Sequence, residues 1–414
     1  MVKEILIAQK QDLDKKLKEH YVERTTNLKK LEAPLIKVII GPRRAGKSFF
    51  ALHFLNKKGN FGYVNFDDEK LVGVKDYDII VEAMNTVYKN PEFVLFDEIQ
   101  NLPKWELFLN RLHRRNLNLI VTGSNSKLLS KELATHLTGR YFLITIFPFS
   151  FKEYLEIEKK ELTSHQIKEK LYNYIIYGGY PEPLIRKMDY KDYLTILFNS
   201  IVYKDIVKRY KIRFPQRIEN LAFYLMSNIA NEYSYNNLSK MTKINSVHTT
   251  KKYFGYLEEA FIFFSLSKFS YKVKEQITSN KKIYCIDNGF IHANAFKSSP
   301  DFGRLYENAV AIELKRRELD NDIRIYYWKN PQQEEVDFVI KQGLKVKQLI
   351  QVCFNVNDLK TKDREIRALI KAGKELKCNN LLIITEDIEK EEKAEWFGDK
   401  ATIRFIPLWK WLLE

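Results

Sequence analysis

The chain has 414 residues and carries 69 Lys and Arg against 53 Asp and Glu, a formal net charge of +16 at pH 7. A composition that is 45% hydrophobic and 29% charged is typical of a soluble globular protein and argues against a disordered one. No apolar run approaches the roughly 18 residues that a membrane-spanning helix needs, and the N-terminus lacks the apolar core of a secretory signal. The three cysteines stand far apart, which argues against a disulfide framework and a zinc site. We therefore expect a cytoplasmic protein without a membrane partner.

The predicted elements divide the chain into five segments with an α/β fold class. Residues 1–33 are lysine-rich and have helical spacing. Between residues 34 and 150, short strand-like runs alternate with helical patterns, which predicts a parallel sheet with helices on both faces. Residues 151–232 are predicted to form a helical lid or linker, and residues 233–290 a winged helix-turn-helix. Residues 291–414 return to a mixed α/β pattern.

A glycine-rich loop follows the first predicted strand. The stretch GPRRAGKS fits the pattern GxxxxGK[ST], and it lies between a strand and an amphipathic helix, the context that this motif requires. Glycines let the backbone N–H groups and the helix N-terminus face phosphate groups, the lysine adds a positive charge, and the serine is a magnesium ligand. The predicted ATP-binding residues are Gly41, Pro42, Arg43, Arg44, Ala45, Gly46, Lys47 and Ser48.

Two acidic residues follow a later buried strand, FVLF. Asp97 and Glu98 therefore lie at the carboxyl end of that strand, where the sites of α/β proteins assemble. We expect Asp97 to hold Mg²⁺ together with Ser48, and Glu98 to act as the general base that polarises the attacking water. No NKxD-type guanine signature occurs in a fitting position, so the expected cofactors are ATP and Mg²⁺.

Further polar residues surround the next two predicted strands. Ser124 or Asn125, after the strand LNLIVT, could sense the γ-phosphate, and a turn that caps the following helix is an equally good interpretation. Arg140 comes just before the final strand and could reach the γ-phosphate of a neighbouring subunit. A surface arginine is the alternative that the residue pattern alone favours.

A family resemblance is carried by five stretches, GPRRAGKS, LFDEIQNLPKW, TGSNSKLLSKELATHLTGR, FPFSFKEY and YGGYPE. Together they resemble a family of prokaryotic AAA+-type ATPases whose members carry a C-terminal domain of unknown function. The resemblance is collinear over nearly the whole chain. It implies an AAA+-like fold and ATPase activity, with Arg140 as an arginine finger and Gln100 and Asn125 as polar groups of the active site.

The middle of the chain is strongly basic. Residues 201–290 contain 15 Lys and Arg against 7 Asp and Glu, a balance of +8. The stretch SYNNLSKMTKINSVHTTKKYF fits a helix-turn-helix whose second helix begins near Ser246 with exposed basic residues. This combination suggests DNA as a partner. A uniformly basic protein surface, or a winged helix that docks proteins, would give the same pattern.

The last segment has the element order of a PD-(D/E)xK nuclease core. That core needs a glutamate on a helix, an aspartate on a strand, and a glutamate and lysine two residues apart on the next strand. Glu307 and Asp337 fill the first two positions, but Gln351 and Cys353 stand where the glutamate and lysine belong. Related ATPases often have E-V-K there. We therefore predict a degenerate nuclease-like site, although a displaced lysine such as Lys345 or Lys347 could compensate.

These observations predict a magnesium-dependent ATPase that acts as a nucleotide-driven switch in a nucleic-acid transaction. Two alternatives stay open at this point. One is an ATP-regulated DNA endonuclease, and the other is a regulatory ATPase that acts only on proteins. A homo-oligomer is compatible with the arginine-finger interpretation.

Overall fold

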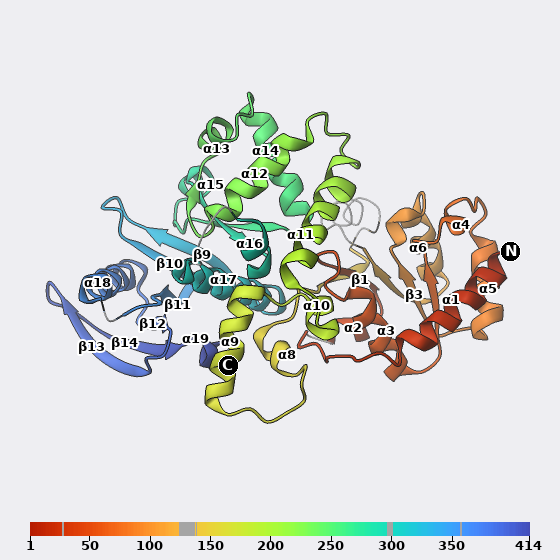
Figure 1. Cartoon of the computed structure of the whole chain (residues 1–414), viewed down its shortest axis with the longest axis horizontal. Helices are drawn as coiled ribbons and strands as arrows, with labels where there is room; N and C mark the ends of the chain where they lie inside the picture. The colour runs from red at the N-terminus through yellow and green to blue at the C-terminus, as the bar shows by residue number, and fades with distance from the viewer. Residues whose placement is uncertain (27–28, 124–136, 138, 296–300, 357) are drawn as a thin grey trace. The chain divides into compact units, whose positions relative to one another are not determined.

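A computed structural model describes residues 1–26, 29–123, 137, 139–295, 301–356 and 358–414 (Figure 1). The chain forms two compact units. The N-terminal unit comprises Met1–Pro148 with Glu259–Phe261, and the C-terminal unit comprises Phe149–Glu258 with Ile262–Glu414. Within the described residues, no helix is both long and apolar enough to span a bilayer.

The N-terminal unit is a parallel five-stranded sheet with flanking helices, in the strand order β2-β3-β4-β1-β5. Its elements are α1 (Val2–Lys16), α2 (Lys29–Glu32), β1 (Ile36–Ile40), α3 (Lys47–Lys58), β2 (Phe61–Asn65), α4 (Glu69–Val72), α5 (Asp78–Tyr88), β3 (Phe93–Asp97), η1 (Ile99–Asn101), α6 (Trp105–Arg114), β4 (Asn118–Thr122) and β5 (Tyr141–Thr145). This arrangement fits the predicted P-loop ATPase-like α/β fold.

Burial explains why these short runs form strands. Every residue of β1 is buried, and β2, β3 and β4 are buried along most of their length. Such continuous burial is expected of a parallel sheet that is covered by helices. Helix α3 contacts four of the strands, and α1 packs on α5 and β2. Because β4 lies between β1 and β3, the carboxyl ends of these three strands meet at one edge of the sheet.

The C-terminal unit combines a helical region, a three-stranded sheet and a six-stranded mixed sheet (Figure 1). Its first elements are α8 (Phe151–Leu155), α9 (Ser164–Tyr177), α10 (Pro181–Arg186), α11 (Tyr190–Ser200), the π-helix η3 (Ile201–Val207), α12 (Pro215–Ser227), β6 (Glu232–Tyr233), α13 (Tyr235–Met241), α14 (Val247–Glu259), β7 (Phe263–Ser267), α15 (Val273–Thr278), β8 (Lys281–Cys285) and α16 (Asn288–Asn294). The remaining elements are α17 (Phe302–Asp320), β9 (Arg324–Lys329), β10 (Glu335–Gln342), β11 (Lys345–Val352), α18 (Leu359–Leu376), β12 (Leu381–Thr385), β13 (Lys390–Trp396), β14 (Asp399–Pro407) and α19 (Leu408–Trp411).

The two sheets of this unit differ in their connections. Strands β6, β8 and β7 form the antiparallel three-stranded sheet, and helices α13 and α14 lie between β6 and β7 in the chain. In the larger sheet, β9, β10 and β11 are antiparallel neighbours, and α18 then leads to β12, which pairs with β11 in parallel. The helix-turn-helix and nuclease-like interpretations of these elements stay predictions.

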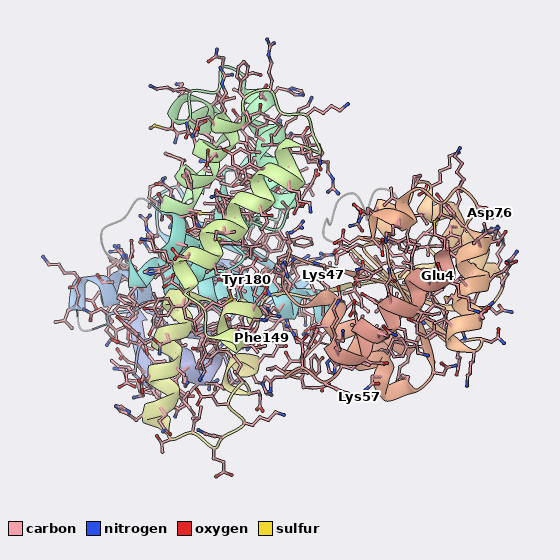
Figure 2. All side chains as sticks on the ribbon, turned by 45° about the vertical axis from the view of Figure 1, so that its right-hand side comes forward. Glu4, Lys47, Lys57, Asp76, Phe149 and Tyr180 are labelled. Atoms are coloured by element: carbon pink, nitrogen blue, oxygen red, sulfur yellow. The ribbon has the colours of Figure 1, made fainter. Side chains whose placement is uncertain are left out.

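A buried aspartate, Asp287, packs against the two glycines of the YGGYPE stretch in the helical region. Asp287 accepts hydrogen bonds from the Gly179 N–H at 2.8 Å and the Gly289 N–H at 2.9 Å. Gly178 has a φ of +77°, and a Cβ there would lie only 1.8 Å from Asp287 Oδ1. The Tyr180 ring, labelled in Figure 2, is buried in the same region and packs on another aromatic ring. The paired glycines are therefore needed to bring this turn against the aspartate.

Candidate functional site

The loop between β1 and α3 has a backbone that only glycine can adopt at its first position. Gly41 has a φ of +147°, and a Cβ there would lie 2.0 Å from the carbonyl oxygen of Ile146. Gly46, at the start of α3, is left-handed with a φ of +91°. The predicted glycine-rich loop therefore wraps closely around the amino end of the helix, where N–H groups attract anions.

Lys47 is the first residue of α3 and is almost completely buried, with 5% of its surface exposed. Its Nζ donates to the carbonyl oxygens of Gly41 at 3.1 Å and Pro42 at 2.8 Å, so the ammonium lies inside the loop. Lys57, at the other end of the same helix, has a side chain that is 62% exposed (Figure 2). The burial of Lys47 therefore keeps a positive charge inside the loop.

Asp97, at the carboxyl end of β3, accepts hydrogen bonds from several hydroxyl groups. Ser48 Oγ donates to Asp97 Oδ1 at 2.7 Å, and the Thr122 hydroxyl at the end of β4 donates to the same oxygen. The Tyr63 hydroxyl donates to Asp97 Oδ2 at 3.2 Å. The structure therefore brings together the two predicted magnesium ligands, Ser48 and Asp97. Thr122 was missed by the sequence analysis, although its place as the last residue of a strand beside β3 is a usable signal.

Glu98 follows with a left-handed backbone, at a φ of 51°. Its N–H donates to Thr122 Oγ1 at 3.1 Å, and the Gln100 amide donates to its carboxylate. Burial raises the pKa of Glu98, and the nearby Lys47 charge offsets this only in part. Gln100 Oε1 is buried and has no hydrogen-bond partner among the described residues. Glu98 thus follows Asp97 directly, and Gln100 contacts the Glu98 carboxylate.

An arginine from the N-terminal segment braces the loop. Arg24 is 7% exposed and donates to the carbonyl oxygens of Ala45, at 3.3 Å, and Phe147. The sequence analysis did not find this residue, because only the path of the chain before β1 brings it to the loop. Among the loop residues themselves, Pro42 and Ala45 are buried, Arg43 is half-buried and Arg44 is exposed.

Three further residues were predicted for this site, and only Arg140 lies among the described residues. Ser124 and Asn125 lie outside the described residues. Arg140 is exposed and lies at the opposite edge of the sheet from the glycine-rich loop, since its carbonyl oxygen accepts from the N–H of Ile36 at the start of β1. The Arg140 side chain therefore cannot reach the glycine-rich loop of the same chain. Its action on the γ-phosphate of a neighbouring subunit stays a prediction.

The donor set suits a magnesium ion that also takes ligands from phosphate and water. Ser48 and Asp97 offer oxygen atoms, which Mg²⁺ prefers, and the described residues contain no cluster of three or more His, Cys, Asp or Glu side chains able to hold a metal by themselves. Mg²⁺ is usually bound through one or two carboxylates together with substrate phosphates. The residues present therefore fit Mg²⁺ in company with a nucleotide.

Comparison with known proteins gives the family. Residues 33–155 match the family described as AAA domain, residues 168–301 match a domain of unknown function (DUF8612), and residues 302–411 match another (DUF4143). The chain is 37% identical to uncharacterized protein MJ1544 of Methanocaldococcus jannaschii, over 91% of this chain and 88% of that protein. The chain belongs to the MJ1544 family. Its residues 33–155 form an AAA-type domain.

Other similarities are more distant. An uncharacterized protein of Haemophilus influenzae is 31% identical over 82% of this chain and 87% of its own length. The structure of the Walker-type ATPase PABY2304 of Pyrococcus abyssi superposes with a TM-score of 0.44 and 14% identity, covering 68% of this chain and 94% of that one.

The predicted nuclease-like residues of this MJ1544-family chain lie in the C-terminal unit. Asp337 on β10 and Glu307 on α17 are brought together, because both bind the ammonium of Lys282. Gln351 Oε1 accepts from the Asp337 N–H at 3.1 Å. Cys353 is buried, and its thiol donates to a backbone carbonyl, that of Asn355. Sequence analysis missed Lys282, which belongs to the separate three-stranded sheet.

Proposed function

We propose that this AAA-type domain hydrolyses ATP in a magnesium-dependent reaction and acts as a nucleotide-driven switch. The observation that carries the proposal is the 2.7 Å hydrogen bond from Ser48 Oγ to Asp97 Oδ1. It joins the helix that follows the glycine-rich loop to the acidic end of β3. These two side chains would hold Mg²⁺, which neutralises phosphate charge when it is bound.

Lys47 and the loop provide the phosphate-binding part. The ammonium of Lys47 lies inside the loop and would exchange its two carbonyl partners for phosphate oxygens. Backbone N–H groups at the start of α3 add hydrogen bonds and the positive end of the helix dipole. ATP is preferred to GTP because the sequence has no fitting guanine signature.

Glu98 provides the base. Its carboxylate lies directly after Asp97, and burial raises its pKa, which strengthens it as a proton acceptor. Thr122 contacts both the Glu98 N–H and Asp97, so it fixes the position of the base relative to the metal ligand. In this arrangement, Glu98 takes a proton from the water that attacks the γ-phosphate.

A binding measurement tests the phosphate-binding part separately from catalysis. We expect wild-type protein to bind a fluorescent ATP analogue with Mg²⁺, and the Lys47→Ala variant to lose at least tenfold in affinity. The control is Lys57→Ala on the same helix, which removes only an exposed ion pair with Glu23. Equal affinity of Lys47→Ala and Lys57→Ala would refute the assigned role of the loop.

A second proposal concerns what the switch acts on. Exposed basic side chains gather around the turn and the first half of α14, and they are Lys240, Lys243, His248, Lys251 and Lys252. More lysines, Lys272 and Lys274, are exposed beside β7 and β8. Such a surface supports contact with the phosphate backbone of DNA.

The salt dependence of DNA binding tests this second proposal. We expect duplex DNA to bind with an affinity that falls steeply with salt, and the Lys251→Ala/Lys252→Ala double variant to show a slope reduced by about 2. Lys57→Ala should leave the slope unchanged. Absence of binding at low salt, together with ATP turnover that no nucleic acid changes, would favour a protein partner instead.

A further inference from the structure

Three carboxylates of the C-terminal unit converge on one buried ammonium. Lys282 Nζ lies 2.9 Å from Glu307 Oε1, 2.5 Å from Glu335 Oε1 and 2.9 Å from Asp337 Oδ1. The Lys282 side chain is only 2% exposed, and those of Glu307 and Asp337 are 14% and 7% exposed. A lysine is almost never buried this deeply unless it is paired.

The strand β8 delivers this lysine from outside the six-stranded sheet. Lys282 pairs with Glu232 of β6 on one side and Leu266 of β7 on the other. Two residues further along β8, the Tyr284 hydroxyl donates to Glu307 Oε1 at 2.7 Å, so both side chains point to the same face. The strand is thereby held with its basic side chain facing the acids of α17 and β10.

Backbone contacts fix this placement. The Asn308 side chain accepts from the Cys285 N–H at 2.8 Å and donates to the Cys285 carbonyl oxygen at 3.0 Å. Asn308 follows Glu307 directly on α17 and is completely buried. Because this side-chain amide pairs with both the N–H and the carbonyl group of Cys285, β8 is held against α17. Lys282 therefore has little freedom to move away from the three carboxylates.

We propose that Lys282 is the permanent cation of this acidic site, and that its ammonium takes the position in which Glu307 and Asp337 would otherwise hold a divalent metal ion. This proposal concerns the C-terminal unit and does not depend on the nucleotide chemistry of the N-terminal unit. It gives the cluster a positive partner that is covalently part of the chain and always present.

The pairing and burial of Lys282 separate this role from that of a displaced catalytic lysine. Of the three N–H donors of an ammonium, those of Lys282 hydrogen-bond to Glu307 and Asp337, and Glu335 forms an ion pair with the same nitrogen. A lysine that assists hydrolysis of a phosphodiester needs a donor directed at the attacking water or the phosphate. The Lys282 ammonium faces three carboxylates of its own chain, and at 2% exposure it cannot be reached by a DNA backbone.

The neighbouring residues are also engaged within the chain. Asp337 Oδ2 accepts from the Val352 N–H at 3.0 Å, and the Gln351 amide donates to Glu365 Oε2 at 2.5 Å. Burial raises the pKa of Cys353 to about 12, so its thiol is neutral and cannot replace the lysine of a nuclease. Lys345 and Lys347, considered as replacements from the sequence, are exposed.

The charges of the cluster explain why a cation is required. With Lys282 absent, the buried carboxylates of Glu307 and Asp337 would repel each other, whereas the more exposed Glu335 would keep its contact with Lys329. Even with Lys282 present, burial and the charge of Asp337 raise the pKa of Glu307 to about 7. Removing the ammonium therefore leaves carboxyl groups whose charge must be neutralised, and a divalent ion with oxygen ligands can do this in place of protons.

Counting bound Mn²⁺ by electron paramagnetic resonance tests the proposal in the nucleotide-free full chain. We expect Lys282→Ala, which leaves room for a hydrated ion, to bind one Mn²⁺ per chain more than wild type. The extra ion should be lost in the Lys282→Ala/Asp337→Asn double variant. Any ion held at the glycine-rich loop is common to all three proteins and cancels. No extra ion in a folded Lys282→Ala protein would overturn the proposal.

A milder variant keeps the proposal testable if Lys282→Ala fails to fold. Glu307→Gln leaves Lys282 paired with Glu335 and Asp337, and the proposal expects its Mn²⁺ count to equal that of wild type. A lower Mn²⁺ count in Glu307→Gln would show that wild type holds a metal ion at this site. Plasmid cleavage by wild type that needs Mn²⁺ and disappears in Glu307→Gln would contradict the proposal in the same way.

Discussion

The Thr122 hydroxyl donates a hydrogen bond to the Asp97 carboxylate, although the two residues are 25 positions apart in the sequence. They meet because β3 and β4 are parallel neighbours whose carboxyl ends lie at the same edge of the sheet. Ser48 donates to the same oxygen of Asp97. Two hydroxyls from different elements therefore fix the orientation of the acid that we assign to Mg²⁺.

Replacing Thr122 by valine tests this orientation, because valine keeps the shape and removes the hydroxyl. We expect the ATP turnover of Thr122→Val to fall by about tenfold or more, as is common when a hydrogen-bond partner of a metal ligand is lost. Thr122→Ser is the matched control and should retain most of the activity. Steady-state phosphate release measures both, and equal rates for the two variants would contradict the role of the hydroxyl.

The pH dependence of turnover tests Glu98 as the base. A base works only when it is unprotonated, so turnover should fall as the pH is lowered through the pKa of Glu98. Since burial raises that pKa, the midpoint should lie above the ordinary value for a glutamate. The residual turnover of Glu98→Gln should lack this acidic decline. If turnover of Glu98→Gln falls at low pH as it does in wild type, the titrating group is not Glu98.

Gly179 should tolerate no side chain. A Cβ at this position would lie 2.3 Å from the carbonyl oxygen of Phe149, a backbone atom that cannot move aside cheaply. We expect Gly179→Ala to lower the free energy of unfolding by about 2–3 kcal/mol. Gly303 in α17 is the matched control, because its nearest neighbour to a Cβ is 3.7 Å away, and Gly303→Ala should be neutral or stabilising by up to about 1 kcal/mol. Denaturant unfolding compares the two, and similar losses would contradict the prediction.

Asp287 should make the stability of the chain depend on pH. Burial raises its pKa in the folded protein from 3.8 to about 7. The folded state therefore keeps a proton that the unfolded state releases, and the resulting stabilisation is complete below about pH 4 and is lost as the pH rises to about 7. The change is on the order of 4 kcal/mol. The difference in unfolding free energy between wild type and Asp287→Asn should therefore change by about 4 kcal/mol between about pH 4 and pH 7. A difference that stays constant with pH would refute the prediction.

The sequence was sufficient for the parts of the site that depend on local order. The glycine-rich loop, Lys47 and the pair Asp97 and Glu98 each follow directly from a strand and the residues after it. Thr122 also ends a predicted strand, so the rule that parallel strands end at one edge could have identified it. The parallel sheet itself follows from the alternation of buried strands and helices, which persists over the first 150 residues.

Residues that reach a site from a distant segment could not be predicted in this way. Arg24 contacts the loop only because the chain before β1 passes over it, and nothing in its local pattern marks that path. Lys282 alternates with Tyr284 on a short strand, which identifies a face but not the acids that the face meets. The mismatch at Gln351 and Cys353 was visible in the sequence, whereas the lysine that joins Glu307 and Asp337 was not.

ATP hydrolysis by the AAA-type domain is tested most sharply by steady-state turnover with Mg²⁺ of wild type and Glu98→Gln, each first shown to bind ATP. We predict that wild type turns over ATP, and that Glu98→Gln binds ATP with similar affinity but hydrolyses it at least 100-fold more slowly, because only the base is lost. ATP binding without hydrolysis by wild type, with or without DNA, would refute the proposed ATPase activity.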